Sequence, residues 1–264
     1  MKLGIEGRVA IVGGASKGMG LATAKALARE GALVVMVARG ADQLAISCEQ
    51  IANQYGSERV ISVAADLSKK EEIDTVVSHT LSHWGRVDIS INNLGGPPPG
   101  EPSSLTDELW YQAMDLNFFS VVRMSQSVIP IMKKNNFGRI ISVLSLSIKQ
   151  PEENLALSTV ARTAASSYSK VLSTEVASSN ITVNTVLPGS IETDRLKVVA
   201  EMQAKRQGAN MKDAMGLRQA QIPASRFGKA EEAADLICFL ASDKAGFITG
   251  QNILIDGGQY KGVF

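Results

Sequence analysis

Residues 9–32 read VAIVGGASKGMGLATAKALAREGA, a short apolar run followed by glycines and then by a stretch of helical periodicity. This order predicts a strand, a loop and a helix. The loop glycines are spaced G-x-x-x-G-x-G, and glycine lets the backbone adopt positive φ and approach a pyrophosphate at the helix amino terminus. The segment therefore predicts a dinucleotide-binding loop, a tight turn without a ligand being the alternative. The residues expected to contact the dinucleotide are Gly14, Ser16, Lys17, Gly18, Met19 and Gly20.

Similar apolar, β-branched runs recur along the chain, and longer stretches of helical periodicity separate most of them. This βαβ succession predicts an α/β fold: a Rossmann-type, doubly wound, mainly parallel seven-stranded sheet with helices on both faces. No linker or repeat interrupts it, so we predict a single domain over residues 1–264, with ligands at the carboxyl ends of the strands. The runs are RVAIVG (8–13), LVVMVA (33–38), RVISVAA (59–65), VDISIN (87–92), GRIISVLS (138–145), ITVNTVL (181–187) and NILID (252–256).

The composition excludes several other classes of protein. Of the 264 residues, 45% are hydrophobic and 20% are charged, which rules out collagen-like and disordered chains. The net charge of +1 provides no field for nucleic acid or an anionic membrane, and neither is expected as a partner. Cys48 and Cys238 lack the spacing of a zinc site or a disulfide framework, and no signal peptide or membrane span is apparent, so we expect a cytoplasmic protein.

Two segments interrupt the alternation of strands and helices. GGPPPGEPSS at 95–104 is rich in proline and predicts a stiff loop at the ligand edge. Residues 193–226 form two amphipathic helical segments that are either an ordinary surface pair or a substrate lid. This segment carries Arg195, Arg206 and Arg218, which would suit an acidic or acyl substrate but equally fit a solvated helix face.

The end of the second predicted strand bears on the choice of dinucleotide. NAD-specific sites place a carboxylate there, whereas this chain has Ala38 followed by Arg39. The Arg39 fork suits a 2′-phosphate, and Lys17 can add a second positive charge, so NADP(H) is favoured over NAD(H). Two solvated surface cations are the alternative. Asp66 and Leu67 are expected to end the third strand, where a carboxylate and a backbone amide can bind adenine.

From about Gly7 to Gly258 the chain resembles the short-chain dehydrogenase/reductase family. The resemblance implies that Asn93 and Gly95 line the adenosine side and that the protein is a homotetramer or dimer. The chain departs mildly from the family's motifs at Gly13 and Leu94, where the family usually has Thr and Ala. The matching motifs are GGASKGMG, ADL, NNLG, MDLNFFS, GRIISVLS, VNTVLPGSIET and GQNILIDGG, and the implied nicotinamide-binding residues are Pro188, Gly189, Ile191 and Thr193.

The same resemblance implies a catalytic Asn at Asn117 and a carbonyl-polarising Ser at Ser145. The family's proton-donating Tyr is expected thirteen residues after this Ser, and its Lys four residues later; these positions hold Ser158 and Arg162. Thirty residues separate Ser158 from Pro188, the family's ungapped spacing, so the assignment is in register.

No other residue is a suitable replacement for the missing Tyr and Lys. Tyr168 lies ten residues beyond Ser158, about 15 Å along the helix and about 80° around it, so we expect it to pack and Lys170 to be solvated. His79 and His83 are one helical turn apart, outside the expected crevice, and we predict no metal site.

The leading interpretation is an NADP(H)-dependent oxidoreductase acting on a small carbonyl or alcohol. Ser145 would polarise the substrate oxygen, while Arg162 would supply positive charge or hold the nicotinamide ribose. Neither an aliphatic hydroxyl nor a guanidinium is a ready acid, so water ordered by Ser145, Ser158 or Asn117 would deliver the proton. A structural ion pair of Arg162 with Glu152 or Glu153 is the alternative role.

Two other functions stay open at this point. A chain with complete nucleotide-binding motifs but no proton donor also fits a catalytically inert protein, an NADP(H)-binding sensor or partner subunit. Non-redox chemistry is the third possibility, as in halohydrin dehalogenases, family relatives that also pair Ser with Arg. Those relatives keep the Tyr and lack the nucleotide loop, the reverse of this chain.

Overall fold

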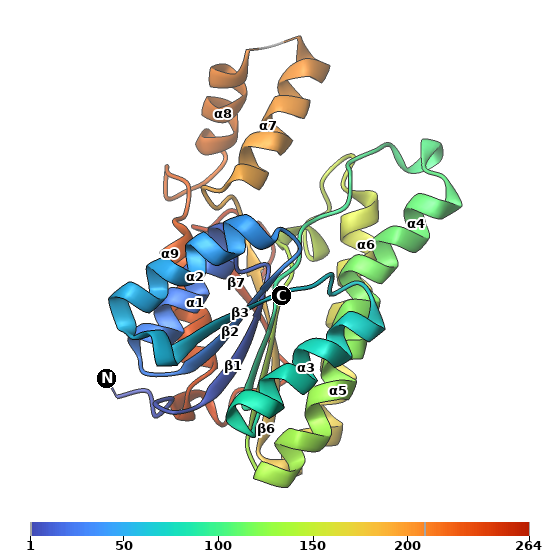
Figure 1. Cartoon of the computed structure of the whole chain (residues 1–264). Coiled ribbons are helices and arrows are strands. Elements are labelled where there is room, and N and C mark those ends of the chain that lie inside the picture. Colours follow the sequence, from blue (N-terminus) through green and yellow to red (C-terminus); the bar gives the residue numbers. More distant parts are fainter. Residues whose placement is uncertain (1, 209, 264) are drawn as a thin grey trace.

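The computed structural model describes residues 2–208 and 210–263. Its centre is a parallel seven-stranded sheet in the order β3-β2-β1-β4-β5-β6-β7 (Figure 1). Every strand predicted from the apolar runs is present, which confirms the doubly wound, Rossmann-type architecture. The strands are β1 (Val9–Gly13), β2 (Leu33–Ala38), β3 (Val60–Ala64), β4 (Ile89–Asn92), β5 (Gly138–Val143), β6 (Ile181–Pro188) and β7 (Asn252–Ile255).

Helices cover both faces of the sheet because successive strand residues point to opposite sides and both sides are apolar. In β2, Val34 and Met36 pack with α1, α2 and α9, whereas Val35 and Val37 pack on the opposite face with α3, α5 and α6. In the described part of the chain, no helix is both long and apolar enough to cross a membrane. The α-helices are α1 (Gly18–Arg29), α2 (Ala41–Tyr55), α3 (Lys70–Trp84), α4 (Asp107–Met114), α5 (Ser120–Asn135), α6 (Ala156–Val176), α7 (Asp194–Gln207), α8 (Met211–Ala220) and α9 (Ala230–Leu240).

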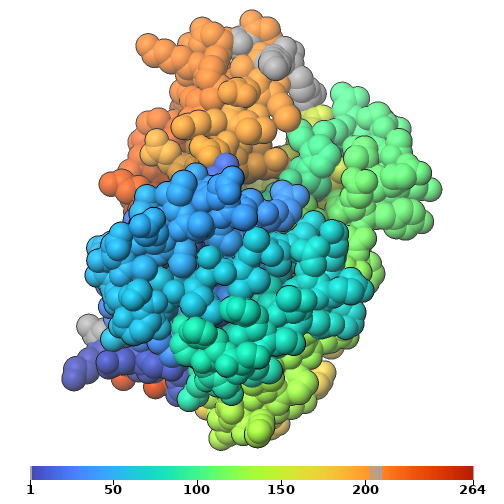
Figure 2. All heavy atoms as spheres, in the orientation of Figure 1, coloured from blue at the N-terminus to red at the C-terminus, as the bar shows by residue number. Residues whose placement is uncertain are grey.

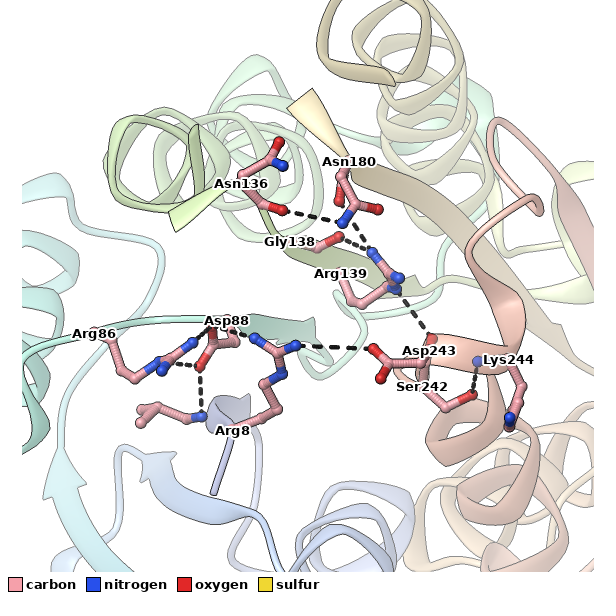
Figure 3. Close-up of polar contacts among 11 residues, drawn as sticks. Arg8, Arg86, Asp88, Asn136, Gly138, Arg139, Asn180, Ser242, Asp243 and Lys244 are labelled. Carbon is pink, nitrogen blue, oxygen red and sulfur yellow. Dashed lines mark hydrogen bonds and ion pairs between the residues drawn. The ribbon is translucent and has the colours of Figure 1, made fainter. Parts of the chain in front are cut away.

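A buried carboxylate joins elements at the amino ends of the strands (Figure 3). Asp88 is fully buried and accepts hydrogen bonds from the backbone N–H of Val9 at 2.9 Å and from Arg86 Nε and Nη2, each at 2.7 Å. Arg8 Nη1 lies 3.6 Å from the same carboxylate. The pairing compensates a charge that would otherwise be costly to bury.

A buried arginine completes this edge of the sheet. Arg139 donates to the main-chain oxygens of Gly138 at 2.8 Å, Asn180 at 3.1 Å and Ser242 at 3.1 Å. Burial lowers the pKa of its guanidinium. These contacts hold the amino ends of the strands together, so a ligand site is left to the loops at their carboxyl ends.

The segment 193–226 forms the two helices expected from its periodicity, α7 and α8, which pack against each other and extend beyond the sheet (Figure 1). Residue 209, between them, lies outside the described residues. Whether this pair closes over a substrate stays a prediction.

Candidate cofactor and substrate cleft

A cleft of about 810 Å³ opens at the carboxyl ends of the strands. Loops that follow β1 to β6 line it, together with residues of α7 and Arg218 of α8. In Figure 2 the orange segment that contains α7 and α8 stands above the blue elements of the amino-terminal part of the chain. The cleft brings together most of the residues singled out in the sequence: Gly14, Ser16, Lys17, Gly18, Met19, Arg39, Asp66, Leu67, Asn93, Gly95, Ser145, Ser158, Arg162, Pro188, Gly189, Ile191 and Thr193.

The loop after β1 has a shape that only glycine permits. Gly14 and Gly18 have φ values of +59° and +58°. A Cβ on Gly20 would lie 2.2 Å from the carbonyl oxygen of Gly14, so Gly20 allows the helix to pack against the loop and does not itself line the cleft. Asn93 Nδ2 donates to the carbonyl oxygen of Gly13 at 3.2 Å and braces the loop from β4.

The predicted phosphate-binding cations differ in their surroundings. Arg39 directly follows β2 and is exposed, with no carboxylate of the described residues within 4.0 Å. Lys17 Nζ lies 2.9 Å from Asp194 Oδ2 at the start of α7, an exposed ion pair that sequence reasoning did not anticipate. The hydrogen bond from Lys17 lowers the pKa of Asp194.

Asp66 stands near Arg39 at the same end of the cleft. β3 ends at Ala64, so Asp66 lies in the loop after the strand. Burial raises the pKa of its carboxyl, but hydrogen bonds from the main chain and hydroxyl of Ser68, together with the charge of Arg39, outweigh this effect, and the pKa is lowered.

Ser158 and Arg162 form a hydrogen-bonded pair on the first two turns of α6. Arg162 Nε donates to Ser158 Oγ at 3.1 Å, and both side chains are buried at the cleft wall. The i, i+4 spacing places them on one helix face, as the sequence required.

The rest of the Arg162 guanidinium is bound by main-chain oxygens. Nη1 donates to Val143 and Leu144, each at 2.9 Å, and Nη2 donates to Leu94 at 3.3 Å. Burial, and then the charge of Arg195, lower the pKa of Arg162 to about 10, so it remains a cation at neutral pH.

The suggested ion pair of Arg162 with Glu152 or Glu153 is wrong. Among the described residues, no carboxylate lies within 4.0 Å of the Arg162 guanidinium. Glu152 instead accepts from Arg218 Nη2 of α8, at 2.9 and 3.2 Å. Arg218 Nε also donates to Ser190 Oγ at 3.2 Å, so this side chain joins α8 to two cleft loops.

Ser145 and Asn117 occupy different surroundings. Ser145 follows β5, caps the short helix Leu146–Ile148 and accepts a hydrogen bond from the N–H of Ser147 at 3.1 Å. Asn117 lies in a π-helical turn, Asp115–Phe119, and donates through Nδ2 to the carbonyl oxygen of Gly95 at 3.0 Å. Its Oδ1 is buried without a partner in the described structure, and Asn117 does not line the cleft.

The residues considered as replacements for the Tyr and Lys lie elsewhere. Tyr168 packs against Phe118 with ring centroids 6.4 Å apart, and Lys170 is exposed; neither lines the cleft. His79 and His83 are exposed on α3. Within the described ranges, no group of three or more metal-ligating side chains gathers.

From the sequence, Arg195, Arg206 and Arg218 suit either an acidic or acyl substrate or a solvated helix face, and their contacts could not be predicted. Arg195 Nη2, on α7, donates to the carbonyl oxygen of Pro97 in the loop after β4, at 3.0 Å. The side chain of Arg206 lies outside the described residues. No spacing in the sequence signalled the contact of Arg195, because its partner is a main-chain oxygen 98 residues away.

Known proteins resemble this chain over nearly its whole length. The family described as enoyl-(acyl carrier protein) reductase matches residues 14–259. The 3-oxoacyl-[acyl-carrier-protein] reductase FabG of Escherichia coli is 36% identical over 258 residues, which cover 98% of this chain and 99% of that protein.

Solved structures extend this similarity. The L-sorbose reductase of Gluconobacter frateurii, complexed with NADPH and L-sorbose, is 34% identical, covers 100% of both chains and superposes with a TM-score of 0.94. YwfH, an NADPH-dependent reductase involved in bacilysin biosynthesis, is 33% identical with a TM-score of 0.93 and covers 98% of this chain and 100% of its own.

Proposed function

The chain belongs to the short-chain dehydrogenase/reductase family and is an oxidoreductase of carbonyl or alcohol groups. We propose that it uses NADP(H) and that Ser158 and Arg162 act in place of the family's usual Tyr and Lys. The observation that carries the proposal is that one cleft is lined both by the glycine loop and Arg39 and by Ser145, Ser158 and Arg162. The similar reductases crystallised with NADPH support the choice of dinucleotide.

The nucleotide end of the cleft fits this dinucleotide. Bound NADPH supplies a hydride and a charged 2′-phosphate. Arg39, which is exposed and has no carboxylate of the described residues within 4.0 Å, would hold the phosphate. The amino terminus of α1, which begins at Gly18 in the glycine loop, would bind the pyrophosphate through backbone amides. Asp66, Leu67, Asn93 and Gly95 would contact the adenosine. The nicotinamide would lie against the loop that contains Pro188, Gly189, Ile191 and Thr193.

The reacting end offers two hydroxyl donors and a fixed cation. Ser145 Oγ accepts from the N–H of Ser147, and Ser158 Oγ accepts from Arg162 Nε, so each hydroxyl hydrogen is left to point toward a substrate oxygen. The Arg162 charge would stabilise negative charge that develops on that oxygen during reduction. Arg162 would also contact the nicotinamide ribose.

Proton delivery is the step at which this site differs from the family pattern. A serine hydroxyl is a far weaker acid than a tyrosine, and Arg162 holds its proton at neutral pH. We infer that Ser158, which lines the cleft, orients a water that supplies the proton. Loss of a positioned acid costs roughly 10²- to 10⁴-fold in rate, so slow but measurable turnover is expected.

One observation favours a second candidate, an inert NADP(H)-binding sensor or partner subunit. Four protein acceptors already bind the Arg162 guanidinium, as in a structural role. The deciding experiment measures NADPH and NADH consumption by wild type and by the Ser158→Tyr, Arg162→Lys double variant, with ketones, aldehydes and keto acids. Wild-type turnover supports the reductase; turnover by the double variant alone supports the sensor.

We also propose that the protein works in the cytoplasm as a homo-oligomer, a tetramer or dimer. Free thiols at Cys48 and Cys238 agree with a reducing compartment. Val160 and Val171 expose 49% and 74% of their surface on α6, which is consistent with a helix face that a second copy covers.

A further inference from the structure

Arg195 lies where the first turn of α7 meets the proline-rich loop after β4. Its guanidinium rests on Gly96, since a Cβ there would lie 2.7 Å from Nη2 and 3.1 Å from Cζ. Any other residue at 96 would displace this side chain. The glycine thus makes room for a guanidinium in the wall of the cleft.

Among the residues that the structure describes, the charge of Arg195 has no close counter-charge. In the part of the chain that the structure describes, no carboxylate lies within 4.0 Å of Arg195 or of Arg162. Two of the carboxylates that line the cleft are already used: Glu152 binds Arg218, and Asp194 binds Lys17. The others, Asp66 and Glu192, lie near Arg39 and on the exposed rim, respectively.

The two uncompensated guanidinium groups share one loop. Arg162 donates to Leu94 and Arg195 donates to Pro97, three residues further on. Burial lowers the pKa of Arg195, and its charge helps to lower the pKa of Arg162. Positive charge is therefore concentrated beside Ser158 and Ser145, where the proposed substrate oxygen lies.

Arg195 also has hydrogen-bonding capacity to spare. A guanidinium has five N–H donors in a planar fork, and the described structure shows one hydrogen bond from Arg195 to a protein acceptor. Arg162, by contrast, uses its donors on Ser158 and three carbonyl oxygens. Arg195 is consequently the better placed of the two to bind an anionic group.

We propose that Arg195 binds a carboxylate of the substrate, so that the natural substrate is a small oxo acid or hydroxy acid. This inference rests on the reductase function proposed above. A carboxylate matches the guanidinium fork in two parallel hydrogen bonds and supplies the missing negative charge, whereas a neutral ketone would leave both cations uncompensated. The cleft also has to hold the dinucleotide, which limits the substrate to a small molecule.

The test compares acids with uncharged counterparts. Wild type, Arg195→Gln and Lys212→Gln are assayed with NADPH on 2-oxopentanoate and 4-oxopentanoate and on the methyl ester of each. Lys212→Gln is the matched control, because Lys212 is an exposed cation of α8 that does not line the cleft. Binding of NADPH is measured separately by fluorescence.

Wild type is expected to prefer at least one acid over its ester by about tenfold in kcat/KM. Arg195→Gln should lower kcat/KM for that acid by about 10- to 100-fold, mainly through KM, as expected for loss of a hydrogen bond to a charged group. Its ester activity and its NADPH affinity should stay within about twofold of wild type. Lys212→Gln should behave as wild type.

Equal use of acids and esters, or an equal loss on both in Arg195→Gln, would overturn the inference while leaving the reductase function intact. Weaker NADPH binding in Arg195→Gln would instead assign this side chain to the cofactor. A second measurement does not depend on turnover: calorimetry of pentanoate and pentanamide with the NADP-loaded protein. Pentanoate should bind more tightly, and Arg195→Gln should remove the difference; no difference in wild type refutes the proposal.

Discussion

Arg162 Nε donates a 3.1 Å hydrogen bond to Ser158 Oγ, one helical turn earlier on α6. The bond fixes the serine oxygen as an acceptor and so directs its hydroxyl hydrogen away from the arginine. The same guanidinium is held by Val143, Leu144 and Leu94. The site therefore holds a fixed cation and an oriented hydroxyl where the family pattern has the phenol of a Tyr that donates the proton.

Replacing Ser158 by Ala should reduce kcat about 10- to 100-fold, because the substrate oxygen loses one donor and the proton loses its relay. NADPH affinity should stay within about twofold. Steady-state kinetics and fluorescence titration measure the two effects. Thr159→Ala, one residue along, should leave kcat near the wild-type value, and a similar loss there would point to a general defect in α6.

The pH dependence of turnover should follow Arg162. Burial favours the neutral form of a base and therefore lowers its pKa, to about 10 for Arg162. We expect kcat/KM for reduction to be level across neutral pH and to fall as pH rises through about 10. In Arg162→Lys the fall should begin at lower pH, because lysine starts from a lower ordinary value. Identical profiles for the two proteins would exclude Arg162 as the titrating group.

The choice of dinucleotide should depend on Arg39. Arg39→Gln removes the charge that faces the 2′-phosphate, so the Kd of NADPH should rise about 10- to 100-fold while the Kd of NADH changes by less than about twofold. Isothermal titration with both dinucleotides measures this difference. Asp194→Asn serves as a comparison, because it frees Lys17 and should tighten NADPH binding; equal weakening of NADPH and NADH in Arg39→Gln would argue against phosphate recognition.

Stability should depend on the buried carboxylate at the opposite edge of the sheet. Asp88→Asn leaves Arg86 without its anionic partner and leaves Arg8 with only the carboxylate of Asp243, at 3.9 Å. We expect the free energy of unfolding to fall by about 2 to 3 kcal/mol, less than for a fully buried pair because both arginines are partly exposed. Urea denaturation measures the change. Asp243→Asn, at a half-exposed carboxylate, should cost much less.

Association of copies should depend on the outer face of α6. Val171→Asp places a charge on the exposed apolar surface and should shift the protein toward monomer in sedimentation or light scattering. Lys170→Asp, on the same exposed part of the helix, controls for the added charge. A wild-type monomer at all concentrations would contradict the proposed oligomer.

The sequence was sufficient for the sheet because its strands are apolar on both faces and separated by clear helical stretches. The roles of Gly14 and Gly18 could also be predicted, because residues with a Cβ rarely adopt the positive φ values found at these positions. The positions of Ser158 and Arg162 followed from the family resemblance, and their i, i+4 spacing placed both on one face of a helix.

Contacts between distant segments could not be predicted in the same way. Proximity in the chain suggested Glu152 or Glu153 as an alternative partner of Arg162, but α8 brings Arg218 to Glu152 from 66 residues away. The pair of Lys17 with Asp194 spans 177 residues. Such partners depend on how the loops converge at the carboxyl edge, and no local pattern encodes that convergence.

The loop after β4 contacts Arg162 and Arg195 through main-chain oxygens, which accept hydrogen bonds from the two guanidinium groups. Its consecutive prolines, Pro97 to Pro99, have no N–H, and their fixed φ leaves the unfolded chain fewer conformations to lose. The carbonyl oxygens of Leu94 and Pro97 are thus held in place before any ligand arrives. The site proposed for the substrate carboxylate is therefore preorganised, because a stiff loop supports both guanidinium groups and little conformational entropy would be lost on binding.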